Sequence, residues 1–431
     1  MNLTRSAIAL ILVMAATSFA QQNDVGKLLQ ESAALIQAGK FADAEPLLQK
    51  TTRIAPANSD AHNLLGIVLD QLGKTAEAER EYRTGIQLNP KAVSPRANLG
   101  VLLAKTNRQT EAVQIFESVL KLKPNHPQTI INLGLLYVSI KNFTAAVDPL
   151  KRAAEMQPGS FDLKLNLGIA LFQTNNPDEA EKAFLDAMPL STASAEPAYY
   201  LGLIAFNRNQ DENAEAYFKQ AVEIEPKHVS ASFMLGELFA KYKRYADAKP
   251  FYEKALELEK SKPVYYIRLG GMYIYLSDFN AAFQIFQKAS KTFPEIPEIH
   301  YFLAITARAK SDSDLAIIEV KKSLALKETA DSNALLGSIL SDRNEDTEAD
   351  KFLRKAILLN PEHFNSNHDL GRLLIRQKKF AAALPFLEKA SSLMPDNPDV
   401  HYKLFLAYSR LKQKEKADRE LAIFKELSER K

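Results

Sequence analysis

Histidine and carboxylate side chains are the groups in this 431-residue sequence that could hold a metal ion or transfer protons. His363 and His368 are close in sequence but span an expected turn, a poor arrangement for two ligands to one ion. No H-E-x-x-H motif, glycine-rich phosphate loop or G-x-S-x-G turn occurs. We therefore predict no enzymatic activity, no cofactor and no metal site. The histidines are His62, His126, His228, His300, His363, His368 and His401.

Alanine marks a repeat that runs through nearly the whole sequence. Its spacing is 34 residues, with a single interval of 33 between Ala316 and Ala349. A fixed period of this length is typical of stacked helical repeats, in which each repeat buries its apolar face against its neighbours. The sequence therefore predicts an elongated array. The alanines are Ala44, Ala78, Ala112, Ala146, Ala180, Ala214, Ala248, Ala282, Ala316, Ala349, Ala383 and Ala417.

Glycine recurs at position 8 when each repeat is numbered so that the alanine is position 20. Because glycine costs about 1 kcal/mol relative to alanine inside a helix, its repetition needs a packing reason. We expect the small residues at positions 8 and 20 to face each other where two helices approach closely. The glycines are Gly66, Gly100, Gly134, Gly168, Gly202, Gly236, Gly270, Gly337 and Gly371.

Each repeat has the pattern of two helices joined by a short turn. Residues 98–123 carry apolar residues at i, i+3, i+4 and i+7 in both halves, with a polar break at residues 106–108. Proline is common at position 32, as in Pro90 and Pro124, where it ends the second helix. No comparable run alternates apolar and polar residues as a strand would. The sequence predicts an all-α fold.

These recurring positions resemble the tetratricopeptide repeat (TPR) superfamily over about residues 25–431. The resemblance implies a right-handed superhelical solenoid of about twelve helix-turn-helix repeats. The large aromatic residue that the family often has at position 4 is largely absent here, where His62 is an example. Departures from the period at residues 190–197, 260–263 and 326–331 are candidate internal joints. The predicted array spans residues 21–431, with repeats 1 to 12 near residues 25–58, 59–92, 93–126, 127–160, 161–194, 195–228, 229–262, 263–296, 297–329, 330–363, 364–397 and 398–431.

The resemblance implies that the first helix of each repeat lines a concave groove, with positions 2, 5, 9, 12 and 13 pointing into it and position 6 close by. Asn98, Asn132 and Asn166 occupy position 6 in early repeats. They resemble the asparagines with which family members hold a ligand, and an amide side chain can donate and accept along an extended peptide. The alternative is that asparagine tolerates a half-exposed helix position.

Large aromatic residues occupy the groove positions of the middle repeats. Such rings dominate binding energies, so we predict that this aromatic strip is the main partner site. The alternative is that some rings pack between neighbouring helices as core. The rings of the aromatic strip are Phe172, Tyr199, Tyr200, Phe206, Phe233, Tyr275 and Tyr301.

Arginines take over the same positions toward the C-terminus. Arg308, Arg372, Arg376 and Arg410 form a predicted basic wall that could hold carboxylates of a partner. The alternative is neutralisation within the protein, because carboxylates such as Asp369 and Asp399 occur nearby in the same register.

The first residues have the pattern of a secretory signal peptide. Arg5 precedes an apolar stretch, and residues 18–20 form a small-x-small cleavage site, so we predict cleavage after Ala20. An uncleaved membrane anchor is the alternative, although the apolar stretch is short for a span of about 20 residues. The sequence has no cysteine, which suits an oxidising compartment. We predict a periplasmic or secreted protein whose only membrane contact is this segment, if uncleaved.

The predicted function is an exported protein-binding scaffold that holds a peptide segment or protein partner in the concave groove. The alternative is an accessory or regulatory subunit that positions an envelope enzyme or polysaccharide or protein export machinery. A formal net charge of +3, with 25% charged residues, argues against nucleic-acid binding. No small-molecule substrate is predicted.

Overall fold

The computed structural model describes residues 22 and 24–429, and the regular elements within them are all helical. These residues form two compact units, one ending at Glu225 and the other beginning at Pro226. The division lies in the last residues of predicted repeat 6, at none of the three candidate joints. The predicted signal peptide, residues 1–20, lies outside the described residues. Within the described part of the chain, no helix is long and apolar enough to cross a membrane.

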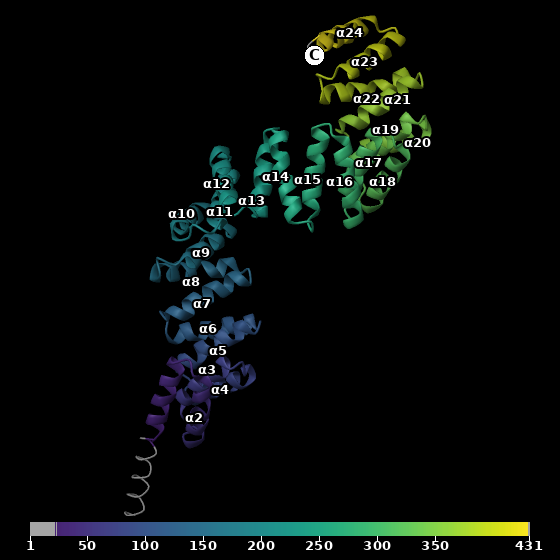
Figure 1. The fold of residues 1–431 in the computed structure, drawn as a ribbon. Coiled ribbons are helices and arrows are strands. Elements are labelled where there is room, and N and C mark those ends of the chain that lie inside the picture. The colour runs from purple at the N-terminus through teal and green to yellow at the C-terminus, as the bar shows by residue number, and fades with distance from the viewer. Residues whose placement is uncertain (1–21, 23, 430–431) are drawn as a thin grey trace, which may run out of the picture. The chain divides into compact units, whose positions relative to one another are not determined.

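In the first compact unit, each helix packs against the next one along the chain (Figure 1). A helix over residues 24–37 precedes the named ones. These are α2 (Phe41–Ile54), α3 (Ser59–Gln71), α4 (Thr75–Leu88), α5 (Ser94–Lys105), α6 (Gln109–Leu122), α7 (Pro127–Ser139), α8 (Phe143–Met156), α9 (Phe161–Gln173), α10 (Pro177–Ala187), the short 3-10 helix η1 (Met188–Leu190), α11 (Glu196–Asn207) and α12 (Asp211–Ile224).

The second compact unit continues the same alternation. From α3 onward, odd-numbered helices are the first helix of a repeat (helix A) and even-numbered helices are the second (helix B). The helices are α13 (Val229–Lys241), α14 (Tyr245–Leu258), α15 (Pro263–Tyr275), α16 (Phe279–Thr292), α17 (Pro297–Ala309), α18 (Ser313–Leu326), α19 (Ala330–Asp342), α20 (Asp346–Leu359), α21 (Phe364–Arg376), α22 (Phe380–Leu393), α23 (Pro398–Arg410) and α24 (Lys414–Glu429).

Position 8 is glycine because the side chain at position 24 of the same repeat lies against it. A Cβ atom on Gly66 would lie 2.6 Å from Cδ1 of Tyr82, which is far too close for two carbon atoms. The three atoms nearest to this Cβ position all belong to position 24, so the packing reason for the glycine is the side chain at position 24. Where position 8 is Ala304, position 24 is the smaller Val320, and both are fully buried.

Local sequence explains where the A helices begin. The Asn58 side chain accepts hydrogen bonds from the amides of Asp60 and Ala61, and so caps α3. Pro127 and Pro263 are the first residues of α7 and α15, where the missing N–H has no partner to lose. These caps fix the start of each repeat after the proline turn.

Within each compact unit, the A helices of neighbouring repeats contact one another. Examples are α3 with α5 in the first unit and α19 with α21 in the second. Among the described residues, neighbouring B helices lie farther apart than neighbouring A helices. In each compact unit the A helices therefore line the inner face, and their outward side chains form the surface considered next.

Candidate functional site

Three histidines tie a helix A to its helix B and to the turn before it. Nδ1 of His300 lies 2.6 Å from Oε2 of Glu319, and Nε2 lies 2.9 Å from the carbonyl oxygen of Pro294. Each glutamate follows its histidine by 19 residues, a spacing that is visible in the sequence and could have revealed the pairs. The same arrangement joins His62 to Glu81 and Pro56, and His401 to Glu420 and Pro395.

Two other histidines cap helices with their side chains, and His126 contacts Oγ1 of Thr129 at 2.9 Å instead. Nδ1 of His363 accepts the amide hydrogen of Ser366 at 3.2 Å, and Nδ1 of His228 accepts that of Ala231 at 3.0 Å. His126 occupies the same position before α7. Across the described residues, no group of three or more His, Asp or Glu side chains is arranged to hold a metal ion. The contacts of these histidines are those of packing and capping groups.

The three predicted groove asparagines are half-buried on the A-helix face of the first compact unit. The amide of Asn98 donates to Oδ1 of Asn63 at 2.9 Å, which links the A helices of neighbouring repeats. Asn132 accepts from Gln128, one turn earlier in its own helix, at 2.9 Å. Asn166 donates to the main-chain oxygen of its own helix at 2.7 Å. Each amide therefore already has a partner within the protein.

Tyr200 shows that part of the aromatic strip packs between repeats. Its ring stacks on Phe184, the buried position-24 ring of the preceding repeat, with centroids 4.9 Å and planes 5° apart. Phe172 and Tyr199 meet Tyr200 edge-on, with centroids 5.5 Å and 5.4 Å away. Burial, and the nearby charge of Glu196, raise the pKa of Tyr200 to about 12. These rings join α9, α10 and α11, and only part of each ring reaches the surface.

The remaining rings of the aromatic strip differ in exposure. Phe233 is half-buried, 5.1 Å from the ring of Tyr265 on the next helix A of the second compact unit. Phe206 is half-buried as well. Tyr275 is 65% exposed and stacks on Tyr245, with ring centroids 4.5 Å apart. The aromatic strip is thus a set of partly covered rings, of which Tyr275 presents the largest fraction of its surface.

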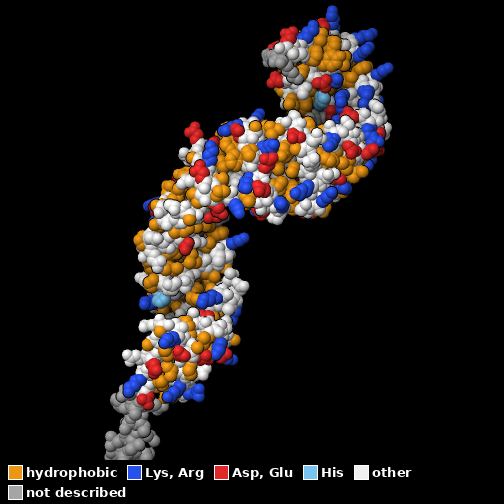
Figure 2. All heavy atoms as spheres, viewed as in Figure 1, with side chains coloured by type: hydrophobic (Ala, Val, Ile, Leu, Met, Phe, Trp, Pro, Cys, Tyr) orange, Lys and Arg blue, Asp and Glu red, His pale blue; other side chains and the backbone are white. Residues whose placement is uncertain are grey.

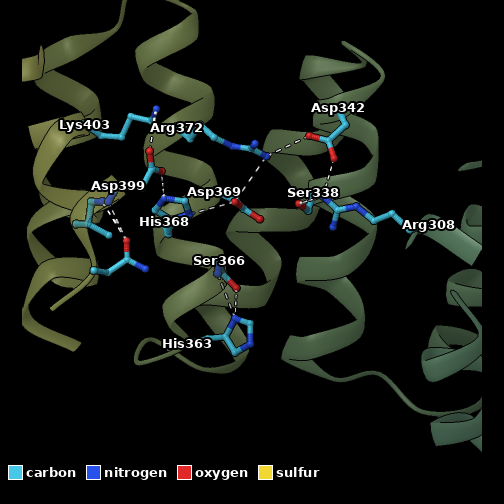
Figure 3. A network of polar contacts seen from close by, with 12 residues as sticks. Arg308, Ser338, Asp342, His363, Ser366, His368, Asp369, Arg372, Asp399 and Lys403 are labelled. Atoms are coloured by element: carbon cyan, nitrogen blue, oxygen red, sulfur yellow. Dashed lines mark hydrogen bonds and ion pairs between the residues drawn. The ribbon is translucent and has the colours of Figure 1, made fainter. Parts of the chain in front are cut away.

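The basic wall is paired with carboxylates of neighbouring helices. Arg308 and Arg372 converge on Asp342, their Nη2 atoms lying 2.6 Å from Oδ2 and 3.2 Å from Oδ1 (Figure 3). Arg376 pairs with Asp346. Arg410 is exposed and forms no ion pair with any described residue. The structure therefore places three of the four predicted arginines in ion pairs within the protein.

His368 extends this network toward the last repeat. Its Nε2 lies 2.8 Å from Oδ2 of Asp399, and its Nδ1 lies 3.3 Å from Oδ1 of Asp369 (Figure 3). Burial alone would lower the pKa of His368, but these two carboxylates outweigh burial and raise it to about 9. The contact lowers the pKa of Asp399 to about 2. Lys403 pairs with the other oxygen of Asp399 at 3.2 Å. A chain of alternating charges thus crosses α17, α19, α21 and α23.

Two adjoining cavities lie on the A-helix face beside this network. The inner cavity, 350 Å³, lies between α17, α19 and α21. The outer cavity, 310 Å³, lies near the N-terminal ends of α17 and α19. They share Tyr301 and Asp331, so they form one groove, named the α17/α19/α21 groove below. Ile305, Leu335 and Arg308 border its inner part.

Tyr301 is the member of the aromatic strip that lines this groove. Its ring meets Phe302 edge-on at 5.3 Å, and Phe302 stacks on the buried ring of Phe286 at 5.3 Å. Burial, and the nearby negative charge of Asp331, raise the pKa of Tyr301 to about 12. The phenol therefore stays protonated near neutral pH and can donate a hydrogen bond. The groove brings together Tyr301, Arg308 and Arg372 of the predicted site, whereas Asn98, Asn132, Asn166 and Phe172 lie in the other compact unit.

The charges on the surface are mixed. Figure 2 shows side chains of both signs interspersed with hydrophobic ones on the visible face, in keeping with a formal net charge of +3. A surface that attracts a polyanion would instead carry a large patch of positive charge.

Comparison with protein families decides the kind of protein. Three tetratricopeptide repeat models match the chain. The first matches residues 35–99, 141–205 and 374–423. The second matches residues 199–263, and the third matches residues 94–126 and 330–363. The chain belongs to the tetratricopeptide repeat superfamily. This TPR protein is therefore a repeat scaffold of the kind that mediates protein or peptide contacts, and no catalytic family is indicated.

Solved structures of other TPR proteins align with the chain at low identity. The Cut9–Hcn1 hetero-tetramer of APC/C matches at 15% identity and a TM-score of 0.45, covering 92% of this chain and 98% of that one. Yeast Tom70 matches at 16% identity and a TM-score of 0.39, covering 92% and 97%. YrrB, described as a TPR protein with an unusual peptide-binding site, matches at 20% identity and a TM-score of 0.41, covering 43% and 95%. No curated protein sequence matches the chain significantly.

Proposed function

We propose that this TPR protein is an exported binding scaffold that holds a peptide segment or protein partner against the A-helix face of its array. The observation that carries the proposal is the α17/α19/α21 groove, in which a half-buried tyrosine, apolar side chains and fixed charges face one continuous space. A rigid array can present several such contacts at once, and a few anchoring side chains then dominate the binding energy.

Site-specific cross-linking tests where the partner binds. A photo-reactive amino acid is placed at Asn365, which is exposed and lines the inner cavity, or at Leu358, which is 82% exposed on helix B of the preceding repeat. We expect a specific adduct in the native cell envelope from position 365 and none from position 358. An adduct from position 358 alone would place the partner on the B helices and contradict the proposal.

A blocking substitution gives the matched test of affinity. Asn365→Trp fills the mouth of the inner cavity without removing a packed side chain, so we expect it to abolish capture of the partner. Gln128→Trp makes the same change at position 2 of repeat 4, where the side chain is also exposed, and should leave capture intact. Equal capture by both variants would exclude this groove as the binding site.

The pattern of residues 1–20 supports the exported location within the proposal. N-terminal sequencing of the protein purified from its native source is expected to begin at Gln21, whereas a chain that retains Met1 would favour the membrane-anchored alternative. The cross-linked partner also discriminates between the two proposed roles. An extended segment or tail supports the scaffold, and a folded enzyme supports an accessory subunit.

A further inference from the structure

We infer that the α17/α19/α21 groove receives a basic side chain, lysine or arginine, from an extended segment of the partner. This inference rests on the proposed function and names the chemistry of the partner. It reverses the expectation that the basic wall selects an acidic partner. The argument depends on which charges of the groove are already paired within the protein and which are not.

The arginines beside the groove are already paired with a carboxylate of the protein through Nη2. Asp342 accepts from both Arg308 and Arg372, and Arg308 also donates to Ser338 at 3.1 Å (Figure 3). Of the other donors of Arg372, Nε is buried away from solvent, so a ligand could reach only Nη1. An acidic side chain would have to displace Asp342 to gain a bidentate contact. Such an exchange replaces one carboxylate by another and adds little binding energy.

Asp331 is a carboxylate of the groove that forms no ion pair with a lysine or arginine of the described residues. It lines both cavities, and its side chain is 63% exposed. Its partner is His363, whose Nε2 donates to Oδ1 at 2.9 Å. Nδ1 of His363 accepts the amide hydrogen of Ser366 at 3.2 Å, so Nε2 is the ring nitrogen that faces Asp331. The contact fixes the position of Asp331 through Oδ1, and the other carboxylate oxygen, Oδ2, has no hydrogen-bond partner among the described residues.

Glu298 supplies a second negative charge at the outer cavity. It is exposed, lines that cavity, and forms no ion pair with any described residue. Lys327 lines the same cavity and is the competing cation, but it too forms no ion pair with a described residue. Tyr301 lines both cavities, and a tyrosine ring attracts a cation placed over its face. An ammonium or guanidinium group placed there meets two carboxylates and an aromatic ring.

Peptide selection with the full chain tests the inference. A bead-displayed library of capped random decapeptides is selected on the wild-type protein, and an enriched peptide is then titrated. We expect enrichment of lysine or arginine at one position, and at least tenfold weaker binding by Asp331→Asn, with a further loss when Glu298→Gln is added. Asp418→Asn makes the same change at an exposed carboxylate on α24, outside the groove, and should leave affinity within twofold. Asp331→Glu, which keeps the charge, should recover part of the binding.

The outcomes separate this inference from the proposed function. Enrichment of acidic peptides that Asn365→Trp excludes would preserve the proposed groove and overturn the basic side chain. Basic peptides whose binding is unchanged in Asp331→Asn would also overturn it. No enrichment, or binding that ignores Asn365→Trp, would overturn both. Circular dichroism and melting of each variant establish that an observed loss is not a loss of fold.

Discussion

The glycine at position 8 and the side chain at position 24 form one packing pair, repeated along the chain. In most repeats the partner of the glycine is an aromatic ring that is almost completely buried, as with Gly168 and Phe184. The glycine thus has a steric role that outweighs its unfavourable helix propensity. Two adjacent glycines in α15 allow this role to be separated from propensity.

Gly270→Ala is expected to destabilise the protein by about 1–3 kcal/mol, because the new methyl group would lie within 3 Å of the Phe286 ring and the core must shift. Gly271→Ala is the matched control, since no atom lies within 4 Å of its Cβ position. This control should be neutral or stabilising by up to about 1 kcal/mol through helix propensity. Urea unfolding of both variants measures the difference. Equal behaviour of the two would exclude the packing explanation.

His368 predicts a specific pH dependence of stability. A histidine in an unfolded chain titrates near pH 6.5, whereas the contacts with Asp369 and Asp399 raise the pKa of His368 to about 9 in the folded protein. The stabilisation is therefore complete below pH 6.5 and is lost as the pH rises through about 9. The free energy of unfolding of wild type relative to His368→Gln should be larger at pH 6 than at pH 10, by on the order of 2 kcal/mol.

Denaturant unfolding at the two pH values checks this prediction, with the variant as the internal reference for all other titrating groups. A difference between wild type and His368→Gln that stays constant from pH 6 to pH 10 would mean that the charge of His368 does not stabilise the fold. The opposite sign of the change would mean that Asp369 and Asp399 are not its charge partners.

At the scale of the elements, the turn between helices A and B uses a left-handed residue in every repeat. Gly39 and Gly73 fill this position in the first two repeats. The others use residues that carry a Cβ atom, with φ between 56° and 64°: Asn107, Lys141, Asn175, Asn209, Lys243, Ser277, Ser311, Asn344, Lys378 and Lys412. The left-handed region is unfavourable for a residue with a Cβ atom, most of all for one that is not Asn or Asp.

Lys141→Gly and Lys378→Gly are therefore each expected to stabilise the protein by about 1 kcal/mol, because glycine removes the steric penalty at φ 59°. Lys141→Ala keeps the Cβ atom and should give no such gain. Thermal melting of the three variants against wild type measures the effect. A gain in the alanine variant equal to that in the glycine variant would show that the lysine side chain, and not the backbone, limits stability.

The sequence predicted the elements better than their contacts. The positions of glycine and proline in each period suffice to place the helix pairs, because they act within one repeat. The sequence did not predict the left-handed residue of the turn, because ten of the twelve turns have Asn, Lys or Ser there instead of glycine. The carboxylates that pair with the basic wall were not predicted either. Asp342, for example, is 34 residues from Arg308 and lies on helix A of the next repeat. A single-repeat pattern contains no signal for such a pair.

At the scale of the whole molecule, stability in a repeat array depends mainly on contacts between nearest neighbours. The tie formed by His300, Glu319 and Pro294 is one such contact, and the ring stack of Phe286 with Phe302 is another. Both join repeats 8 and 9 in the second compact unit. A defect placed there should weaken the adjacent repeats first and more distant repeats less.

Phe286→Ala tests this expectation. The ring is completely buried, so its loss should cost about 3–5 kcal/mol. We expect amide hydrogen exchange to accelerate strongly in α15, α16 and α17, and progressively less in α19 through α23, as followed by mass spectrometry of peptides. Leu358→Ala, at a side chain 82% exposed on α20, is the control and should leave exchange unchanged. Uniform acceleration from α13 to α24 would mean instead that the second compact unit opens as one cooperative body. In that case a partner bound in the α17/α19/α21 groove would stabilise all of that unit, whereas local opening confines the effect to the repeats that line the groove.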